Sequence, residues 1–251
     1  MKRLFGLLCF VVFLLLISSF VSAQLCASNL VIDNPSGIAV DSAGNKYVAD
    51  TDNNRIVKIT STGTTTVLAG SVLGISGDAD DTGTAARFNH PHKVALTPPG
   101  SFGGSFLYVA DTDNNKIKKI NLANLAVTTV SGSGVAGYAN SGPQGPLTAQ
   151  FNHPKGVFVT KLSTNAVEVI VADTGNNVIR RINEVACPLG TICTGSGPFA
   201  GGDILVAGIP QTQGISPLNV VTCAAGVGGM QFNAPEDVFV YTTILNTPQP
   251  S

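Results

Sequence analysis

Hydrophobic residues occur in this chain as short runs with alternating polar positions, separated by clusters of turn-forming residues. Short apolar runs bounded by Gly, Asn, Asp and Ser are typical of an antiparallel meander. In the first such series, strands are expected over Gly37–Asp41, Lys46–Asp50, Arg55–Ile59 and Thr64–Ala69. No window after the N-terminal segment has a convincing helical apolar period, so the pattern predicts an all-β chain.

This pattern recurs along the chain. The stretch Tyr47–Asn54, YVADTDNN, returns almost unchanged at Tyr108–Asn115 and in altered form at Val171–Asn177. A second recurring piece contains a proline and occurs four times, at Asn34–Asp41, Phe88–Leu96, Phe151–Val159 and Phe232–Val240. The near-constant spacing of the copies indicates a repeat architecture, with three units nearly whole and one in part.

Composition narrows the class of protein. The chain has 251 residues, of which 44% are hydrophobic and 12% charged, which suffices for one sizeable core. The formal net charge is −1, and the basic runs Lys116–Lys119 and Arg180–Arg181 lack interleaved aromatic residues. Both observations argue against nucleic acid as a partner.

The N-terminal segment has the features of an export signal. Lys2 and Arg3 precede the uncharged stretch Leu4–Val21, and Val21-Ser22-Ala23 offers a cleavage site before Gln24. We therefore expect residues 1–23 to be a signal peptide and the mature chain, residues 24–251, to be secreted, or periplasmic in a bacterium. The alternative is an uncleaved signal anchor, whereas no membrane span is expected after cleavage.

An oxidising compartment would allow the remaining cysteines to pair. The four disulfide candidates are Cys26, Cys187, Cys193 and Cys223. Three connectivities are open, and one of them joins Cys187 to Cys193 across a turn-like segment and leaves Cys26 with Cys223. A zinc site is a poor interpretation because the spacing is irregular and no Cys-x-x-Cys occurs.

Pro35–Ile59 carries a proline, a Gly-Ile-Ala-Val-Asp strand and then Gly-Asn-Lys-Tyr-Val-Ala-Asp-Thr-Asp-Asn-Asn-Arg-Ile-Val-Lys-Ile. This sequence resembles the NHL repeat, although the Asn-His-Leu triplet that names the family is absent. The resemblance implies a β-propeller of four-stranded antiparallel blades, of which about three and a half are present. It places blade 1 at about 34–69, blade 2 at about 88–131, blade 3 at about 151–208 with a cysteine-containing insertion, and a partial blade 4 at about 232–251.

A ring of the six blades common in this family is not completed by these repeats. Three explanations stay open: further blades are missing, two chains complete one ring, or a compact four-bladed ring uses the lead-in segment before residue 34. Open edge strands favour self-association.

Residues that vary between copies are free to serve a ligand, whereas repeated residues serve the blade. The variable position just after each repeat proline holds the ligand-facing candidates Ser36, His92, Lys155 and Glu236. In a propeller these side chains would lie near one mouth of the channel. The competing interpretation is that they are solvated rim residues.

The repeated carboxylates and carboxamides are interpreted as structural, since three equal copies cannot share one active site. They are expected to form the turns by hydrogen bonds to nearby amides and by left-handed backbone. The residues are Asp50, Asn53, Asn54, Asp111, Asn114, Asn115, Asp173, Asn176 and Asn177. The acidic loop Asp78–Asp81 is interpreted as solvated.

No convergent catalytic or metal-binding set is apparent, and no cofactor is expected. His92 follows a proline as zinc-binding histidines do in NHL-related lyases, but Ser36, Lys155 and Glu236 occupy the matching positions. His90 and His153 precede their prolines and suggest a capping role. The sequence therefore favours a non-catalytic extracellular binding module for protein or glycan, with a channel-centred metal-dependent hydrolase or lyase as the alternative.

Overall fold

The computed structural model describes residues 30–101, 104–140, 146–161, 167–184, 204–208 and 234–238. The chain divides into two compact units, Met1–Val31 and Ile32–Ser251, and the blades belong to the second. The expected signal peptide and the four cysteines Cys26, Cys187, Cys193 and Cys223 lie outside the described residues. In the part of the chain that is described, no helix is long and apolar enough to cross a membrane.

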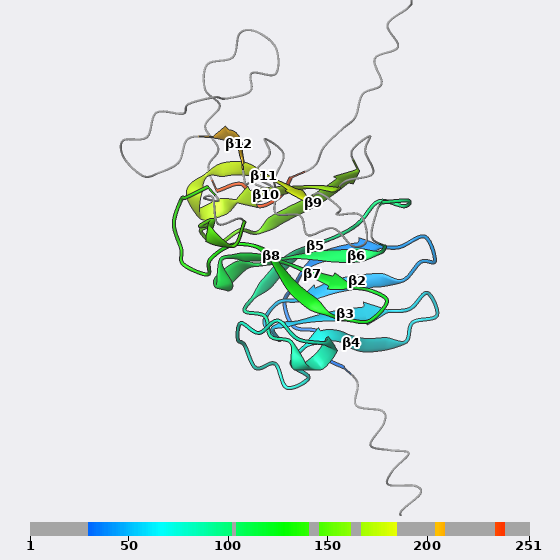
Figure 1. Ribbon diagram of the computed structural model, residues 1–251. Coiled ribbons are helices and arrows are strands. Elements are labelled where there is room, and N and C mark those ends of the chain that lie inside the picture. Colours follow the sequence, from blue (N-terminus) through cyan, green and yellow to red (C-terminus); the bar gives the residue numbers. More distant parts are fainter. Residues whose placement is uncertain are drawn as a thin grey trace, which may run out of the picture. The chain divides into compact units, whose positions relative to one another are not determined.

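Three four-stranded antiparallel sheets follow one another along the sequence (Figure 1). Blade 1 comprises β1 (Pro35–Val40), β2 (Lys46–Asp50), β3 (Arg55–Ile59) and β4 (Thr65–Gly70). Blade 2 comprises β5 (Pro91–Leu96), β6 (Phe106–Asp111), β7 (Lys116–Asn121) and β8 (Val127–Ser131). Blade 3 comprises β9 (Gly156–Lys161), β10 (Val167–Asp173), β11 (Val178–Glu184) and β12 (Ile204–Gly208).

Short 3-10 turns complete the described elements, at Gly83–Ala85, Thr112–Asn114, Pro146–Thr148 and Thr174–Asn176. The central valine of each repeat takes the same place in its blade, with Val48 opposite Ile38, Val109 opposite Val94 and Val171 opposite Val157. The predicted fold class, all-β with four-stranded antiparallel NHL-type blades, is confirmed.

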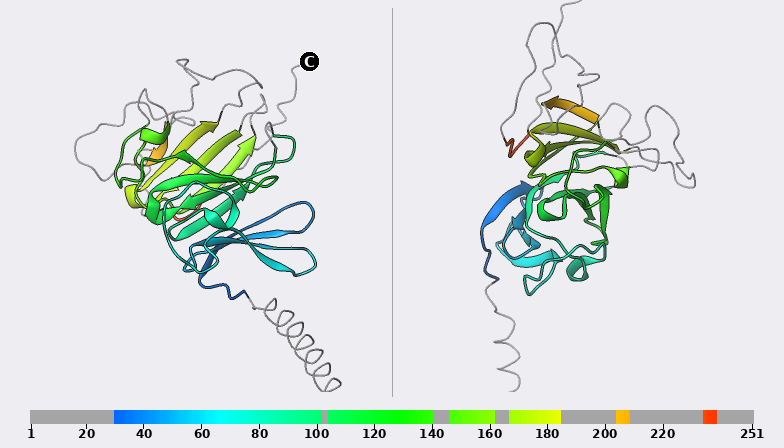
Figure 2. Two further views of the ribbon diagram at one scale, coloured as in Figure 1. Left: turned by 60° about the horizontal axis from the view of Figure 1, so that its bottom comes forward. Right: turned by 90° about the vertical axis from the view of Figure 1, so that its left-hand side faces the viewer.

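The blades are apolar on the faces that pack against one another. One face of blade 1, including Tyr47, Ala49 and Ile56, is buried against Val94 and Val109 of blade 2. The matching face of blade 2 is buried in the same way against blade 3, through Tyr108, Ala110, Ile117, Val157 and Val171 among others. Continuous apolar strands are the expected result when a sheet is covered on both faces, and Figure 2 shows the sheets in succession from two further directions.

The first strands of successive blades approach each other closely. A Cβ at Gly37 would lie 2.4 Å from the carbonyl oxygen of His92 and 2.8 Å from Lys93 Cα. A Cβ at Gly156 would lie 3.0 Å from Asp237 Cα. Glycine is therefore required at these two positions because a backbone of the next repeat occupies the space of a side chain.

The fourth repeat is described only at residues 234–238, in which no strand is assigned. This short segment nevertheless contacts blade 3, since Val238 packs on the cluster of Ile170, Ala172 and Ile179. The start of the fourth repeat thus lies on the face of blade 3 where a fourth blade would begin.

Candidate functional site

The repeated aspartates are fully buried, and each binds the segment that leads into the first strand of its own blade. Asp111 Oδ1 accepts the backbone N–H of Asn89 at 2.8 Å, and Asp111 Oδ2 accepts the side-chain amide of Asn114 at 2.8 Å. Asp173 makes the same two contacts with Asn152 and Asn176, each at 2.8 Å. The bond to a backbone amide of the preceding segment ties the YVAD strand to the proline-containing piece, which the expectation of local turn bonds did not include.

Blade 1 repeats this arrangement. Asp50 accepts the backbone N–H of Asp33 at 2.7 Å and the side-chain amide of Asn53 at 2.9 Å. The second asparagine of each pair has left-handed backbone, with φ of 52° at Asn54, 53° at Asn115 and 57° at Asn177. Asparagine tolerates this conformation better than most residues, which explains its use at a tight reversal.

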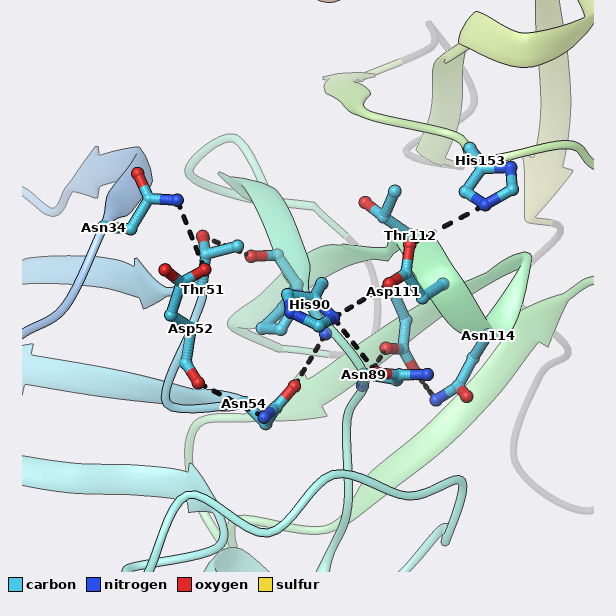
Figure 3. A network of polar contacts seen from close by, with 12 residues as sticks. Asn34, Thr51, Asp52, Asn54, Asn89, His90, Asp111, Thr112, Asn114 and His153 are labelled. Atoms are coloured by element: carbon cyan, nitrogen blue, oxygen red, sulfur yellow. Dashed lines mark hydrogen bonds and ion pairs between the residues drawn. The ribbon is translucent and has the colours of Figure 1, made fainter.

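The same turns also bind the segment that leads into the next blade, as Figure 3 shows for the first junction. Thr51 Oγ1 donates to the carbonyl of Pro91 at 2.8 Å, and Asn54 Oδ1 accepts the backbone N–H of His90 at 2.8 Å. We call this pair of bonds the turn latch. It makes the Asp-Thr-x-Asn-Asn motif a connector between blades as well as a turn within one.

The turn latch recurs at each described junction. Thr112 donates to the Pro154 carbonyl at 2.9 Å, and His153 N–H donates to Asn115 at 2.9 Å. At the third junction, Thr174 donates to the Pro235 carbonyl at 2.6 Å, and Ala234 N–H donates to Asn177 at 2.7 Å. The entry of the fourth repeat is therefore held just as the second and third blades are.

A buried cation accompanies each anchor aspartate. Arg55 Nε donates to Asp50 at 2.7 Å in blade 1, whereas Lys118 Nζ lies 3.5 Å from Asp111 in blade 2. Arg180 Nη1 lies 3.3 Å from Asp173 in blade 3, and its guanidinium carbon lies 4.3 Å from the centre of the Phe151 ring. Lys118 and Arg180 stand two residues further along their strands than Arg55 does. Blade 3 has Val178 at the position of Arg55, and Arg180 supplies the cation instead.

The pKa values of the blade 2 pair follow from its burial. Burial raises the pKa of Asp111 to about 6, although Lys118 and the Asn114 amide act in the opposite direction. Burial alone would lower the pKa of Lys118, but Asp111 and Asp78 outweigh it and raise that pKa above its ordinary value. Burial likewise raises the pKa of Asp173.

The acidic connector is not merely solvated, which corrects the expectation for Asp78–Asp81. Asp78 contacts Lys116 at 2.5 Å and Lys118 at 2.9 Å, and Asp80 accepts the backbone N–H of Thr129 at 2.7 Å. Partial burial alone would raise the pKa of Asp78, but the two lysines hold it below its usual value. The connector is thus fixed to blade 2 by charge, a long-range relationship that its local sequence does not reveal.

The structure brings the variable post-proline residues together. Because β1, β5 and β9 are successive first strands, His92, Lys155 and Glu236 lie near one another, and the adjacent Lys93 and Asp237 join them. We call these five residues and Ser36 the entry cluster. Ser36 Oγ donates to the His92 carbonyl at 3.2 Å and also bonds the Thr51 hydroxyl, so this serine is engaged at the junction.

Two ion pairs cross the entry cluster. Lys155 Nζ lies 2.6 Å from Glu236 Oε1, and Lys93 Nζ lies 2.6 Å from Asp237 Oδ2. The first pair joins blade 3 to the fourth repeat, and the second reaches from blade 2 to that same repeat. Lys155 lowers the pKa of Glu236 by donating a hydrogen bond to its carboxylate. Sequence reasoning identified Lys155 and Glu236 but missed Lys93 and Asp237, which stand where other copies carry glycine.

His92 interacts electrostatically with the members of both pairs. Burial lowers the pKa of His92, and Lys155 lowers it further, while Glu236 and Asp237 act against this shift. The ring is therefore neutral at neutral pH. Its Nδ1 is sealed from water and has no hydrogen-bond partner among the described residues.

The histidines before the prolines form a separate surface group. His90 Nδ1 lies 2.8 Å from Asp113 Oδ2, and His153 Nε2 lies 3.8 Å from Asp113 Oδ1. Both histidines have positive φ, 47° in each case, and donate their backbone N–H to the turn latch. Within the described ranges, no three His, Cys, Asp or Glu side chains are grouped in a way that could hold a metal ion.

Successive blades linked by repeated turn contacts define a repeat protein of the propeller type. The model of the family described as NHL repeat matches residues 33–59. Protein SUPPRESSOR OF QUENCHING 1, chloroplastic, of Arabidopsis thaliana is 31% identical over 157 residues, which cover 59% of this chain and 14% of that protein. NHL repeat-containing protein 2 of Gallus gallus is 36% identical over 114 residues, covering 43% of this chain and 14% of that protein.

Residues 33–59 thus match an NHL repeat, and the chain spans 14% of the length of these two relatives. Among solved structures, an auxiliary nutrient binding protein from Bacteroides thetaiotaomicron is similar with a TM-score of 0.44 and 23% identity. That likeness covers 53% of this chain and 33% of the solved chain.

Proposed function

We propose that the chain is an extracellular binding module, or a periplasmic one in a bacterium, that binds a protein or a glycan through the entry cluster. The observation that carries the proposal is that repeated and variable residues have different roles. Repeated Asp, Thr and Asn side chains are consumed by the anchor bonds and the turn latch, whereas His92, Lys93 and Lys155 gather at one place without serving every junction.

Binding rather than catalysis is supported by the chemistry of the cluster. A nucleophile needs a base within hydrogen-bond reach and a group that orients that base. Ser36 is the hydroxyl of the cluster, but its partners are the Thr51 hydroxyl and the His92 carbonyl rather than an imidazole nitrogen. Polar groups that surround a site without such an arrangement are suited to recognition.

The proposal includes self-association through blade 1. Ile38 is 55% exposed and Val40 56% exposed, whereas Val94 and Val157, which match Ile38 in the next two blades, are 2% and 1% exposed. The difference arises because blades 2 and 3 bury this face against the preceding blade.

A screen of the full chain against arrayed glycans and extracellular proteins tests the main proposal. We expect a ligand whose binding is lost in His92→Ala and in Lys155→Ala but retained in Thr128→Val, since Thr128 is exposed on β8 far from the cluster in sequence. Ligands that bind all three variants equally would place recognition elsewhere and overturn the proposal. N-terminal sequencing of the exported protein is expected to begin at Gln24.

A further inference from the structure

We propose that the entry cluster recognises an extended acidic segment of a protein partner, and that Glu236 and Asp237 occupy the place of that segment in the free chain. This inference rests on the proposed function and narrows its ligand class. It follows from the two ion pairs, from the way the fourth repeat is held, and from the donors that the cluster presents.

The two lysines are spaced for consecutive acidic residues. Lys155 of blade 3 and Lys93 of blade 2 each contact one carboxylate, at 2.6 Å, and these carboxylates belong to the neighbouring residues Glu236 and Asp237. The backbone just before them is held by Thr174 and Asn177 through the turn latch. An acidic dipeptide on a fixed backbone is thus already the occupant of the lysine pair.

The carboxylates of Glu236 and Asp237 can be displaced by the carboxylates of a partner. The side chain of Glu236 is 62% exposed and that of Asp237 is 57% exposed. Ion pairs between groups this exposed contribute little to stability, because water and salt compete for both partners. A partner segment with several carboxylates can therefore replace both internal ones while the turn latch keeps the backbone of the fourth repeat in place.

His92, a further polar group of the cluster, also favours a ligand with hydrogen-bond acceptors. His92 is neutral and half-buried, and its Nδ1 is sealed from water. An unpartnered buried N–H is rarer in proteins than an unpartnered buried acceptor, which favours a proton on Nε2. With Lys93 and Lys155, the ring then presents donors, and carboxylates are the side chains that only accept when ionised.

One glycine allows the acidic dipeptide to approach blade 3 closely. Gly156 lies on the first strand of blade 3, between the blade that carries Lys93 and the repeat that carries Asp237. A side chain at that position would meet the backbone of Asp237 at 3.0 Å. Gly156 thus allows the backbone of Glu236 and Asp237 to lie close to the first strand of blade 3, directly after Lys155.

Titration of a fluorescently labelled (Glu-Asp)5 peptide into the full chain tests the inference, with (Gln-Asn)5 as the uncharged control peptide. We expect Glu236→Gln with Asp237→Asn to bind the acidic peptide about tenfold more tightly than the unchanged chain, because the internal competitors are neutralised. Lys93→Met with Lys155→Met is expected to abolish binding, whereas Lys93→Arg with Lys155→Arg retains it. The control peptide is expected not to bind.

The outcomes separate this inference from the broader proposal. Equal affinity of the acid-neutralised and unchanged chains, binding that survives loss of both lysines, or no binding in any variant would overturn the inference. So would polygalacturonate binding as tightly as the peptide, since the cluster would then recognise carboxylates without regard to a polypeptide. If the broad screen finds a neutral ligand whose binding is lost in His92→Ala, the proposed binding module is supported. The acidic-segment inference alone is then contradicted.

Discussion

Thr112 and Pro154 belong to different blades, yet the Thr112 hydroxyl donates a hydrogen bond to the Pro154 carbonyl at 2.9 Å. The threonine hydroxyl is buried. The carbonyl belongs to the proline that lies just before β9, the first strand of blade 3. The contact turns a sequence motif into a joint between blades. It also explains why threonine follows the aspartate in each of the three copies.

Replacing Thr112 with valine keeps the shape of the side chain and removes this bond. We expect Thr112→Val to lower the free energy of unfolding by about 1–2 kcal/mol, because a buried carbonyl loses its partner. Urea denaturation measures the loss. Thr128→Val is the matched control in the same blade, since Thr128 is exposed, and it is expected to change stability by less than about 0.5 kcal/mol. Equal effects of the two substitutions would contradict the role of the turn latch.

Removal of the anchor carboxylate should have a larger effect. Asp111→Ala deprives Asn89 N–H and the Asn114 amide of their acceptor and leaves the fully buried Lys118 without its buried counter-ion. We expect a cost of about 3 kcal/mol, measured by thermal or urea unfolding.

Asp113→Ala is the control for this change, since Asp113 lies two residues away and its ion pair with His90 is solvent-exposed. Its expected cost is below about 1 kcal/mol. A chain that melts unchanged after Asp111→Ala would show that the anchor bonds do not stabilise the blade.

The raised pKa of Asp111 predicts a pH effect of definite sign. A pKa of about 6 in the folded chain exceeds the ordinary value of 3.8, so the folded state binds more protons between these values. The contribution of this group to stability is therefore complete below about pH 4 and is lost as pH rises through about 6.

Between pH 7 and pH 5 the chain should gain about 1 kcal/mol from this group, and Asp111→Asn should lack that gain. The comparison of urea midpoints at the two pH values measures the difference, with Asp173 and the other titrating groups common to both proteins. Parallel pH profiles of the unchanged chain and the variant would show that Asp111 does not titrate in this window.

The recurrent residues predicted the fold well because each repeat is a local unit. Strand positions, turns and left-handed asparagines follow from alternation and from turn chemistry within a few residues. The fourth strand of blade 1 was expected over Thr64–Ala69 and is found over Thr65–Gly70, a one-residue difference at each end. Such boundaries depend on ladder bonds rather than on residue type.

The candidate site was less accessible to sequence reasoning because its contacts join distant segments. Lys93 and Asp237 stand in different repeats, and their pairing depends on the side-by-side arrangement of first strands. Comparing the residue two places after each proline would have provided a signal, since glycine occurs there in two copies and a charged residue in the other two. The contact of Asp78 with Lys116 had no comparable signal, because a connector's docking site is set by tertiary packing.

The exposed apolar face of blade 1 predicts association in solution. Ile38→Glu with Val40→Glu places two charges on the face that blades 2 and 3 bury, so these changes should weaken any contact through it. Sedimentation velocity over a range of concentrations is expected to show association of the unchanged chain and a monomeric double variant.

Glutamate at Thr66, which is exposed on β4, is the charge control and should leave association intact. A sedimentation coefficient of the unchanged chain that does not depend on concentration would contradict this prediction.

Gly37 and Lys93 occupy matching positions after their prolines, but only Gly37 has a backbone carbonyl where a Cβ would stand. In β1 the irregular register lies between Pro35 and Gly37, so Gly37 pairs directly with Ala49. In β5 the irregularity extends from Pro91 to Val94, and Lys93 lies within it. Both strands share the same one-residue shift, so it is the backbone of blade 2 beside Gly37, rather than the register, that excludes a side chain there.

Gly37→Ala should therefore be destabilising, whereas Lys93→Ala should be tolerated. The alanine Cβ would lie 2.4 Å from the His92 carbonyl and 2.8 Å from Lys93 Cα, and both are backbone atoms that move only with the strand. We expect Gly37→Ala to cost about 2–3 kcal/mol in urea unfolding, with Lys93→Ala below about 1 kcal/mol. Similar stability of the two variants would mean that the first strands of neighbouring blades are not packed closely enough to require glycine.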